Sequence, residues 1–386
     1  MTTTIDNEHK TFNVPNLRFP EFEGEWQEKR LSDIADLSKG IGISKDQLSA
    51  DGEPCILYGE LYTKYKSETI KEVISKTNID NTKLVKSKAN DVIIPCSGET
   101  AEEIATARCV LKDDILLGGD LNIIRLHGYD GSFMSYQLNG KRKYDIAKVA
   151  QGVSVVHLYG EHLKNIKTIN PSLNEQKKIA NLLSLLDERI STQNKIIEDL
   201  KKLKSAISER LFKDAKGDII TLSEICDIVK GEQINGELLS EHGKYYVMNG
   251  GTDPSGYYDN YNVGAHTISI SEGGNSCGYV QFNKCPFWCG GHCYSIQNIA
   301  DNINNLYLYH YLKTEEKAIM KLRIGSGLPN LQKKDLATFK IKLPTSKQQK
   351  AISDILSLLE QKAEIEEQIL IAMQDEKQYL LRQMFI

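Results

Sequence analysis

Two long stretches of the chain repeat apolar residues in alternating steps of three and four, which is the pattern of an amphipathic helix with a coiled-coil seam. In the first stretch the repeat runs through Ile179, Leu183, Leu186, Ile190, Ile197, Leu200, Ile207 and Leu211. In the second it runs through Ile352, Leu356, Leu359, Ala363, Leu370, Met373, Leu380 and Met384. At ~1.5 Å per residue each predicted helix is roughly 55–60 Å long. Because so long a helix with one apolar stripe needs a partner, we expect the two helices to pair with each other.

The two stretches are copies of one element. A shift of 173 positions superposes Gln176 on Gln349, Leu183 on Leu356, and Phe212 on Phe385. The polar residues that interrupt the seam also coincide, Gln193 with Glu366 and Lys204 with Lys377, and we expect them to set the pairing register. Two similar halves related by a pseudo-two-fold axis would make the helices antiparallel.

A second element is duplicated at the start of each half. The decapeptide LSDIADLSKG at 31–40 matches LSEICDIVKG at 222–231. This pattern predicts a short helical turn, capped by Ser32 or Ser223, followed by a strand that ends at glycine. The halves therefore begin and end alike, while the residues between differ.

The unlike middles predict mixed, mostly β domains. Apolar runs rich in β-branched residues, between glycine turns, predict strands at 55–59, 91–95, 121–126, 245–248, 266–270, 278–282 and 292–296. Helices are predicted at 132–148 and 303–322. The predicted fold is α+β with four parts: a domain at 15–171, a long helix at 172–214, a second domain at 217–343, and a second long helix at 345–386.

Composition describes an ordinary globular chain with little sign of its partners. The net charge is −4, so either the protein does not bind nucleic acid, or other subunits neutralise much of the phosphate charge, and composition does not choose between these two. The polar N-terminus lacks the apolar core of a signal peptide, and no apolar run reaches the ~18 residues of a membrane span, so we expect a cytoplasmic protein. Eight cysteines in such a chain indicate free thiols and not a disulfide framework.

Motifs for catalysis are missing from the sequence. It contains no GxxxxGK[ST], HExxH, GxSxG or GxGxxG motif in a suitable context, and no base-gripping motif of an amino-methyltransferase. Cys277, Cys285, Cys289 and Cys293 could bind zinc if they converged. Their spacing is not that of a standard zinc site, and buried cysteines in strands are the preferred interpretation, so no metal is predicted.

Glycine-rich and aromatic–basic segments are the candidates for nucleic-acid contact. Short polar side chains on flexible loops can approach base edges, and aromatic residues interleaved with lysines suit sugar–phosphate contact. Each segment could instead be an ordinary turn or, for 58–66, an exposed strand edge. The candidate DNA-binding residues are Tyr58, Tyr62, Lys64, Ser97, Glu99, Thr100, Gln151, Ser154, His157, Asn249, Thr252, Ser271, Asn275, Ser276, Ser326 and Asn330.

Taken together, these features resemble the specificity subunits of type I restriction–modification systems. The resemblance rests on PNLRFPEFEGEW at 15–26, the two decapeptides, a glycine–leucine–leucine–proline series that occurs twice (Gly152, Leu158, Leu163, Pro171; Gly325, Leu331, Leu336, Pro344), and EQKKIANLLSLLD at 175–187. It covers nearly the whole chain. Asn174 and Lys347 stand where the family often has proline, and Gln348 replaces a usual glutamate, so the resemblance leaves fine helix capping open.

The resemblance implies a non-catalytic subunit that reads a split DNA target through two target-recognition domains, with the paired helices as spacer. It implies two methyltransferase subunits and restriction subunits as partners, and it implies that S-adenosylmethionine, ATP and Mg are bound by those partners and not by this chain. Two alternatives are a self-contained methyltransferase or restriction enzyme with fused recognition domains, and a coiled-coil assembly protein with no DNA role.

Overall fold

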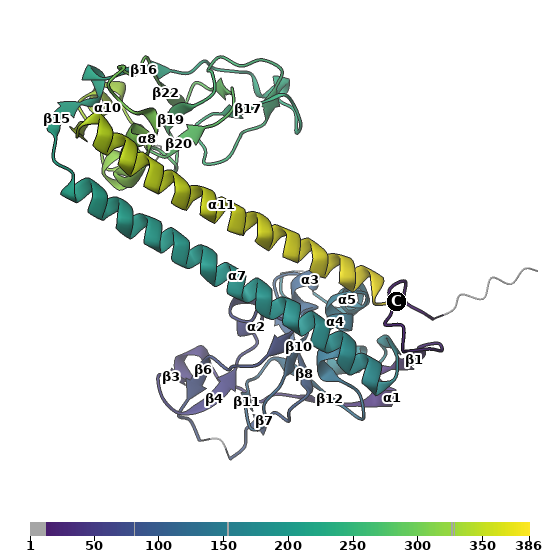
Figure 1. Ribbon diagram of the computed structural model, residues 1–386. Helices are drawn as coiled ribbons and strands as arrows, with labels where there is room; N and C mark the ends of the chain where they lie inside the picture. The colour runs from purple at the N-terminus through teal and green to yellow at the C-terminus, as the bar shows by residue number, and fades with distance from the viewer. Residues whose placement is uncertain (1–12, 81, 153, 326, 328) are drawn as a thin grey trace, which may run out of the picture. The chain divides into compact units, whose positions relative to one another are not determined.

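The chain is divided into two compact units by its internal contacts. The computed structural model describes residues 13–386 except Asn81, Val153, Ser326 and Leu328. Unit 1 comprises Met1–Asn194 and Ile369–Ile386, and unit 2 comprises Lys195–Gln368. Both units combine β-sheets with helices, and both include part of the two long helices α7 (Leu173–Asp214, 42 residues) and α11 (Ser346–Gln383, 38 residues) (Figure 1).

Unit 1 has two five-stranded sheets and two small pairs. The strand orders are β2-β12-β8-β10-β5, β3-β6-β4-β11-β7, β1-β14 and β13-β9. The strands are β1 (Gln27–Arg30), β2 (Ala35–Lys39), β3 (Leu48–Ser49), β4 (Glu53–Ile56), β5 (Thr69–Ile70), β6 (Ser75–Thr77), β7 (Val85–Lys86), β8 (Asp91–Pro95), β9 (Ser97–Gly98), β10 (Arg108–Val110), β11 (Leu116–Leu117), β12 (Leu121–Leu126), β13 (Val156–His157) and β14 (Lys167–Asn170). The short helices are α1 (Leu31–Ile34), α2 (Glu60–Thr63), α3 (Ala101–Ile104), α4 (Gly131–Asn139), α5 (Lys143–Val149) and α6 (Gly160–Leu163).

The central strand β8 of unit 1 is buried on both faces. Val92 and Ile94 pack into one apolar cluster with Met134 of α4, whereas Ile93 packs on the other face with Ile56 and Leu117. A strand covered on both sides reads as a continuous apolar run, which explains the sequence DVIIP.

Unit 2 has a four-stranded sheet, a three-stranded sheet and one small pair. The strand orders are β16-β22-β19-β20, β18-β17-β21 and β15-β23. The strands are β15 (Asp218–Thr221), β16 (Asp227–Lys230), β17 (Tyr245–Met248), β18 (Tyr257–Tyr258), β19 (Thr267–Ser271), β20 (Val280–Asn283), β21 (Trp288–Cys289), β22 (Cys293–Gln297) and β23 (Lys340–Leu343), and the short helices are α8 (Asn305–Thr314), α9 (Glu316–Met320) and α10 (Lys333–Ala337).

The divergent middles nevertheless share a sheet topology. The order β2-β12-β8-β10 in unit 1 corresponds to β16-β22-β19-β20 in unit 2, and all three pairings are antiparallel in both. In the central strand of unit 2, Ile268 and Ile270 point into the main core, while Ser269 between them bonds Asn283. Its alternating sequence TISIS therefore fills the same position as DVIIP.

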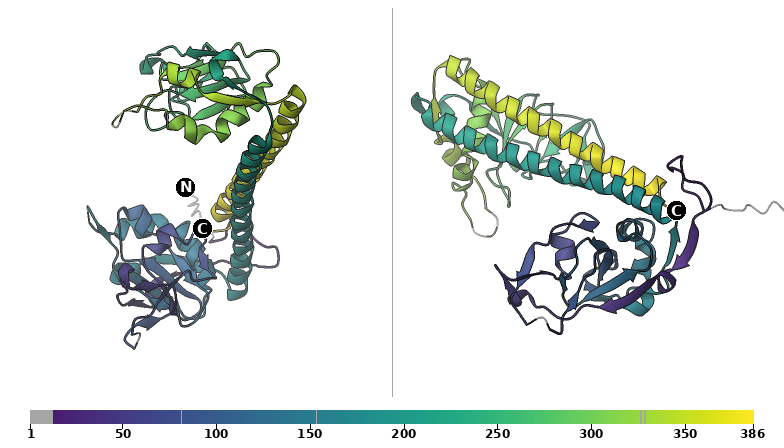
Figure 2. Two further views of the ribbon diagram at one scale, coloured as in Figure 1. Left: turned by 90° about the vertical axis from the view of Figure 1, so that its left-hand side faces the viewer. Right: turned by 60° about the horizontal axis from the view of Figure 1, so that its bottom comes forward.

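The long helices lie side by side and antiparallel in each unit (Figure 1, Figure 2). In unit 1 the start of α7 packs on the end of α11, with Ile179, Leu183 and Met384 in one buried cluster. In unit 2 the end of α7 packs on the start of α11, with Phe212, Ile352 and Leu356 buried together. The helix pairing expected from the apolar repeat and the antiparallel orientation expected from the pseudo-two-fold relation are confirmed.

In unit 1 the segment before β1 contacts the start of α7, the residues after α11 and the domain. The Arg18 guanidinium donates twice to the buried Glu175 carboxylate, at 2.8 Å each. The Trp26 indole lies 5.8 Å from the Phe133 ring and 6.5 Å from the Phe385 ring, measured between centroids. An aromatic residue from each of three distant segments thus closes this end of unit 1.

Two predicted helices are each broken in two. The helix expected at 132–148 is α4 and α5, because Gly140 leaves the helical conformation after donating to the Tyr136 carbonyl. The helix expected at 303–322 is α8 and α9, which meet at Glu315.

The predicted strand at 55–59 ends at Ile56. There the Glu60 carboxylate accepts from the Leu57 amide and starts α2. The segment 58–66 therefore contains a helical turn, and interpreting it as a strand edge was wrong.

The predicted caps of the two decapeptides were also wrong by two residues. Arg30 is the N-cap of α1, and Thr221 is the N-cap of a 3-10 turn at Leu222–Glu224, so Ser32 and Ser223 lie inside the turns. Thr221 forms a capping box with Glu224, a stronger signal than a lone serine. No helix among residues 13–386, with the gaps noted above, is long and apolar enough to cross a membrane.

Two leucines of α11, separated by one residue, allow a matched test of the helix pairing. Leu356 is fully buried, whereas Leu358 is 65% exposed. We expect Leu356→Ala to lower the free energy of unfolding by about 2–5 kcal/mol, since it leaves a cavity in the seam. Leu358→Ala should change it by less than about 0.5 kcal/mol. Urea unfolding of both variants checks this, and equal losses would contradict the pairing described.

Candidate nucleic-acid interface

In unit 1 the loop after the central strand is paired with the glycine segment near the end of the domain. Strand β9 pairs with β13, so that Ser97 faces His157. His157 also exchanges two backbone hydrogen bonds with Gln151, at 2.7 and 2.9 Å. The Leu158 amide donates to the Cys96 carbonyl at 2.8 Å. Three candidate residues from separate parts of the sequence therefore share one surface.

The aromatic segment of α2 joins this surface. The Tyr62 hydroxyl donates to the Ser97 carbonyl at 3.0 Å. A Cβ atom at Gly98 would lie 3.0 Å from that hydroxyl, so glycine leaves room for the contact. Burial raises the pKa of Tyr62 above its ordinary value, and the phenol stays neutral. Tyr58 is exposed nearby in the chain and is free to meet a ligand.

Several candidates in unit 1 have partners within the domain. Thr100 caps α3 by accepting from the Glu103 amide, and Lys64 donates to Glu60 and Ser75, each at 2.7 Å. These side chains build the loop conformation and are poorer candidates for base contact. Gln151, Ser154, His157 and Glu99 remain exposed.

Tyr159 is a residue that the sequence analysis missed. Its ring is 53% exposed and stacks on the His157 ring, with centroids 6.3 Å apart. Val155 is also exposed. The alternation of Val155, His157 and Tyr159 is the signal that could have found it, since alternate residues of a strand share a face.

Unit 2 repeats this arrangement with different side chains. Gly273 forms a β-bridge with Asn330, which also bridges Ile324. The Leu331 amide donates to the Glu272 carbonyl at 2.7 Å, matching the Leu158–Cys96 bond of unit 1. Asn275 and Asn330 are exposed and Ser276 is half-buried. Ser326 lies outside the described residues.

A buried carboxylate supports the loop of unit 2, and the sequence analysis missed it too. Glu272 Oε1 accepts from Lys230 Nζ at 2.7 Å and from the Tyr294 hydroxyl at 2.9 Å. The Tyr294 hydroxyl also lies 3.1 Å from the Leu331 carbonyl, so the group connects both loop segments. Lys230 belongs to the repeated decapeptide, which was the available signal.

The remaining candidates of unit 2 differ in accessibility. Ser271 is buried and its hydroxyl donates to the Gly250 carbonyl at 2.7 Å, so it supports the backbone from inside. The Asn249 side chain accepts from the His292 amide at 3.1 Å. Thr252 is exposed and bonds Asp253.

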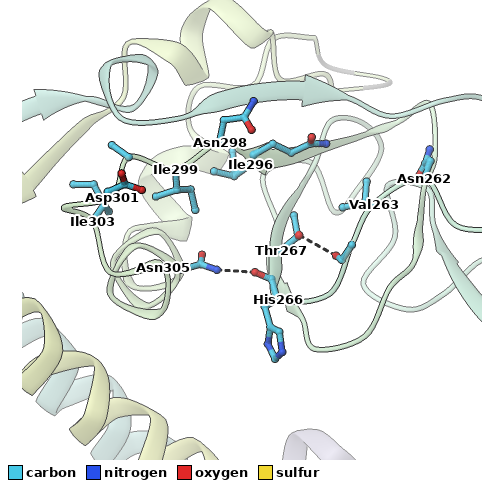
Figure 3. Close-up of a pocket in the computed structure, with 13 residues that line it drawn as sticks. Asn262, Val263, His266, Thr267, Ile296, Asn298, Ile299, Asp301, Ile303 and Asn305 are labelled. Carbon is cyan, nitrogen blue, oxygen red and sulfur yellow. Dashed lines mark hydrogen bonds between the residues drawn. The ribbon is translucent and has the colours of Figure 1, made fainter.

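Two hollows in the structure relate differently to these residues. A hollow of about 1000 Å³ in unit 1 is lined by Tyr58 and Lys64. A hollow of about 530 Å³ in unit 2 is lined by Thr267, Asp301 and Asn305 (Figure 3). There the Asn305 amide donates to the His266 carbonyl at 2.6 Å. None of the candidates that the structure describes lines this second hollow.

The cysteine cluster of unit 2 forms weak bonds to carbonyl groups. Cys277 Sγ lies 3.0 Å from the Glu272 carbonyl, and Cys289 Sγ lies 3.5 Å from the Cys293 carbonyl. Cys285 is exposed, unlike the other three. Within the described part of the chain, no group of three or more His, Cys, Asp or Glu side chains is placed to hold a metal ion.

The fold and these surfaces define a duplicated protein with two like domains, each presenting a different loop surface and each joined to a long helix. Comparison with known families agrees. The chain belongs to the family of the type I restriction modification DNA specificity domain, whose model matches residues 23–202 and 216–374.

Individual relatives support this membership. The chain is 26% identical over 390 residues to the MjaVIII specificity subunit of a type I restriction enzyme from Methanocaldococcus jannaschii, covering 90% of this chain and 88% of that protein. It is 33% identical over 147 residues to a protein of Mycoplasma genitalium named as a candidate type I specificity subunit, and this match spans 37% of this chain and only 38% of that relative. A similar match to a Mycoplasma pneumoniae relative spans 39% of its length.

A solved structure shares the fold. The S subunit of a type I restriction–modification system from M. genitalium superposes with a TM-score of 0.70 at 22% identity, over 97% of this chain and 99% of that one. The predicted α+β class, with two mixed domains each followed by a long helix, is confirmed.

His157 and Asn330 are matched positions for testing the two surfaces. If the two surfaces read DNA, we expect His157→Ala to weaken sequence discrimination in one half of the target by about 1–3 kcal/mol and Asn330→Ala to do so in the other half, because the two side chains belong to different units and would contact different base edges. Binding competition with targets altered in one half checks this. A loss spread evenly over both halves would contradict the assignment.

Proposed function

We propose that this chain is the DNA-reading subunit of a type I restriction–modification system. In this proposal unit 1 reads one half of a split target and unit 2 reads the other, through recognition domains at 15–171 and 217–343. The observation that carries the proposal is the repeated pairing of the loop after the central strand with the glycine segment, presenting unlike side chains in the two units.

The chemistry of the exposed side chains supports this reading. Unit 1 presents an amide from Gln151 and an imidazole–phenol pair from His157 and Tyr159, whereas unit 2 presents the amides of Asn275 and Asn330. Amide side chains can bond adenine in the major groove through two hydrogen bonds, and aromatic rings suit stacking or sugar contact. Two different sets would read two different half-sites.

The outer faces of the long helices are the proposed docking surface for two methyltransferase subunits. In unit 2, Ile355, Leu358 and Ile365 of α11 are exposed and lie three and seven positions apart, which places them along one face of the helix. Leu185 of α7 is also exposed and is equivalent to Leu358 under the internal repeat. An exposed apolar stripe on a helix favours an amphipathic helix of a partner.

The net charge of −4 agrees with a role in which partner subunits contact part of the DNA backbone. We propose that methyltransferase and restriction subunits share the phosphate contacts, since this chain by itself is acidic. The chain is proposed to be non-catalytic and cytoplasmic, with S-adenosylmethionine, ATP and Mg bound by the partner subunits. The long helices at 172–214 and 345–386 are proposed to set the spacing between half-sites.

Reconstitution separates this proposal from its two alternatives. We expect the chain mixed with a cognate methyltransferase subunit to methylate a split sequence, and the chain alone to methylate nothing. Sequencing that maps methylated bases provides the measurement. Methylation by the chain alone would favour a self-contained enzyme, and absence of methylation with every cognate partner would favour an assembly protein without a DNA role.

Exchange of one recognition domain tests the division of labour. Replacing residues 41–151 with the matching region of another specificity subunit should change only one half of the methylated target, since the candidate residues of unit 2 are untouched. The reciprocal exchange in unit 2 is the matched control. A change in both half-sites from a single exchange would contradict two independent readers.

A further inference from the structure

A buried lysine connects the two long helices in unit 1. Lys377 Nζ of α11 lies 2.6 Å from Asp187 Oδ1 of α7 and 2.7 Å from Glu68 Oε2 of the domain. The three side chains are only 12%, 8% and 11% exposed. Burial opposes the charge on Lys377, but attraction to both carboxylates outweighs it and raises the pKa of the ammonium group. Asp187 Oδ2 also accepts from the Tyr136 hydroxyl at 2.7 Å.

Unit 2 contains the same group with the roles of the helices exchanged. Here α7 provides Lys204, whose Nζ lies 3.0 Å from Glu360 Oε1 of α11; the two side chains are half-buried, 23% and 29% exposed. Glu360 also accepts from the Tyr309 hydroxyl at 2.9 Å. Burial favours the neutral acid, but the bonds from Lys204 and Tyr309 prevail and lower the pKa of Glu360. The neighbouring His310 bonds Ser357, and burial lowers its pKa to about 4, so it adds no charge at neutral pH.

The internal repeat relates the two groups residue by residue. The shift that superposes the helices places Asp187 on Glu360 and Lys204 on Lys377. Asp187 and Lys204 are 17 positions apart in α7, and Glu360 and Lys377 are also 17 positions apart in α11. The lysine–carboxylate pairs of the two units therefore report one and the same antiparallel register.

Other registers would bury these charges against apolar residues. A slip by one heptad in either direction keeps an apolar stripe facing an apolar stripe, so the seam alone discriminates weakly. The same slip would bring Asp187 level with Leu370 or Met384, and Glu360 level with Ile197 or Leu211. A carboxylate that loses its cation is strongly unfavourable where it is buried, as at Asp187, and less so at the half-buried Glu360, so the two pairs together disfavour the slipped pairings.

We propose that the Lys377–Asp187 and Lys204–Glu360 pairs select the helix register and are thereby specificity-determining residues for the spacing of the DNA target. The link between the helix register and the spacing of the DNA target rests on the proposed function. The selection of the register by the two ion pairs does not rest on it, because the register is a property of the free chain. Replacing a buried ion pair with apolar residues often preserves or raises stability, so what the pairs supply is a single register and not affinity between the helices.

Spin-label distances in the full-length chain measure the register directly. Neither long helix contains a cysteine, and of the eight native thiols only Cys285 is exposed, so Cys285→Ser supplies the background. Labels on Lys202→Cys and Gln361→Cys report the pairing in unit 2, and labels on Arg189→Cys and Asp375→Cys report it in unit 1; all four positions are exposed. The unaltered pairs should give one narrow distance for each unit.

The decisive variant removes the charges of both pairs and leaves the helices paired. Lys204→Leu with Glu360→Leu is combined with Lys377→Leu, Asp187→Leu and Glu68→Gln, because either pair alone would hold the register of the two continuous helices. This variant should retain helical content but add a second distance, corresponding to an axial offset of about 10 Å for a one-heptad slip. Tyr309→Phe and Tyr136→Phe are included so that no hydroxyl loses its acceptor. One unchanged narrow distance would overturn the proposal.

Two further variants guard against a merely structural effect. In the same background, the charge exchange Lys204→Glu with Glu360→Lys in place of the two unit 2 leucines should restore the single distance, and failure to do so would count against the proposal. Leucine at the exposed pair Lys201 and Glu367, whose atoms are 2.6 Å apart, is the matched control and should leave one distance. Broadening as large as that of the charge-free variant would also overturn the proposal.

A methylation assay then tests whether the helix register sets the spacer length of the DNA target. With a methyltransferase subunit present, the charge-free variant should methylate sites with unchanged half-sites and a mixture of spacer lengths. A single spacer despite two helix distances would contradict the link to specificity. If the unaltered chain directs no methylation, the proposed function fails, while the distances still decide whether the pairs select the register.

Discussion

A single apolar stripe along each of two helices of 42 and 38 residues is the constraint on which the rest of this molecule depends. Isolated in water such helices would leave that stripe exposed, so each is stable only against its copy. Antiparallel pairing brings the start of each helix next to the end of the other. Each unit thus contains the beginning of one long helix and the end of the other, and each recognition domain packs on such a junction through Phe133 or Tyr307.

The polar residues of the seam give this pairing its uniqueness. Apolar contact between regular repeats is permissive, because Leu183 or Leu356 would pack almost as well one heptad away. Lysine and carboxylate side chains at equivalent positions, buried in unit 1 and half-buried in unit 2, are not permissive, since each needs a particular partner. Tyr136 and Tyr309 donate to the same carboxylates, so the domain of each unit contacts the ion pair between its helices.

The two copies share one sheet scaffold and differ in the side chains that their loops display. The sheet order is common to both units although DVIIP and TISIS share little sequence. The two sequences differ because β8 is covered by apolar groups on both faces, whereas β19 is covered by them on one. On that scaffold the loop after the central strand always meets the glycine segment. Only the side chains displayed there differ, His157 and Tyr159 in one unit and Asn275 and Asn330 in the other. A scaffold of this kind permits the reading surface to change without altering the core.

The sequence by itself determined the duplication, the extent of the long helices and the strands β8, β12 and β17 at 91–95, 121–126 and 245–248. These are features whose signal is periodic or continuous along the chain.

Tertiary structure alone decided what depends on residues far apart in the sequence. The meeting of Ser97 with His157, the burial of Ser271 and the support of Glu272 by Lys230 and Tyr294 arise from packing between strands, which no local pattern encodes. The break at Gly140 and the turn at Glu60 likewise follow from single hydrogen bonds that override an otherwise helical or extended pattern. Lys204 and Lys377 could be recognised from the repeat as exceptions in an apolar seam, but their carboxylate partners were defined only when the antiparallel helices came together.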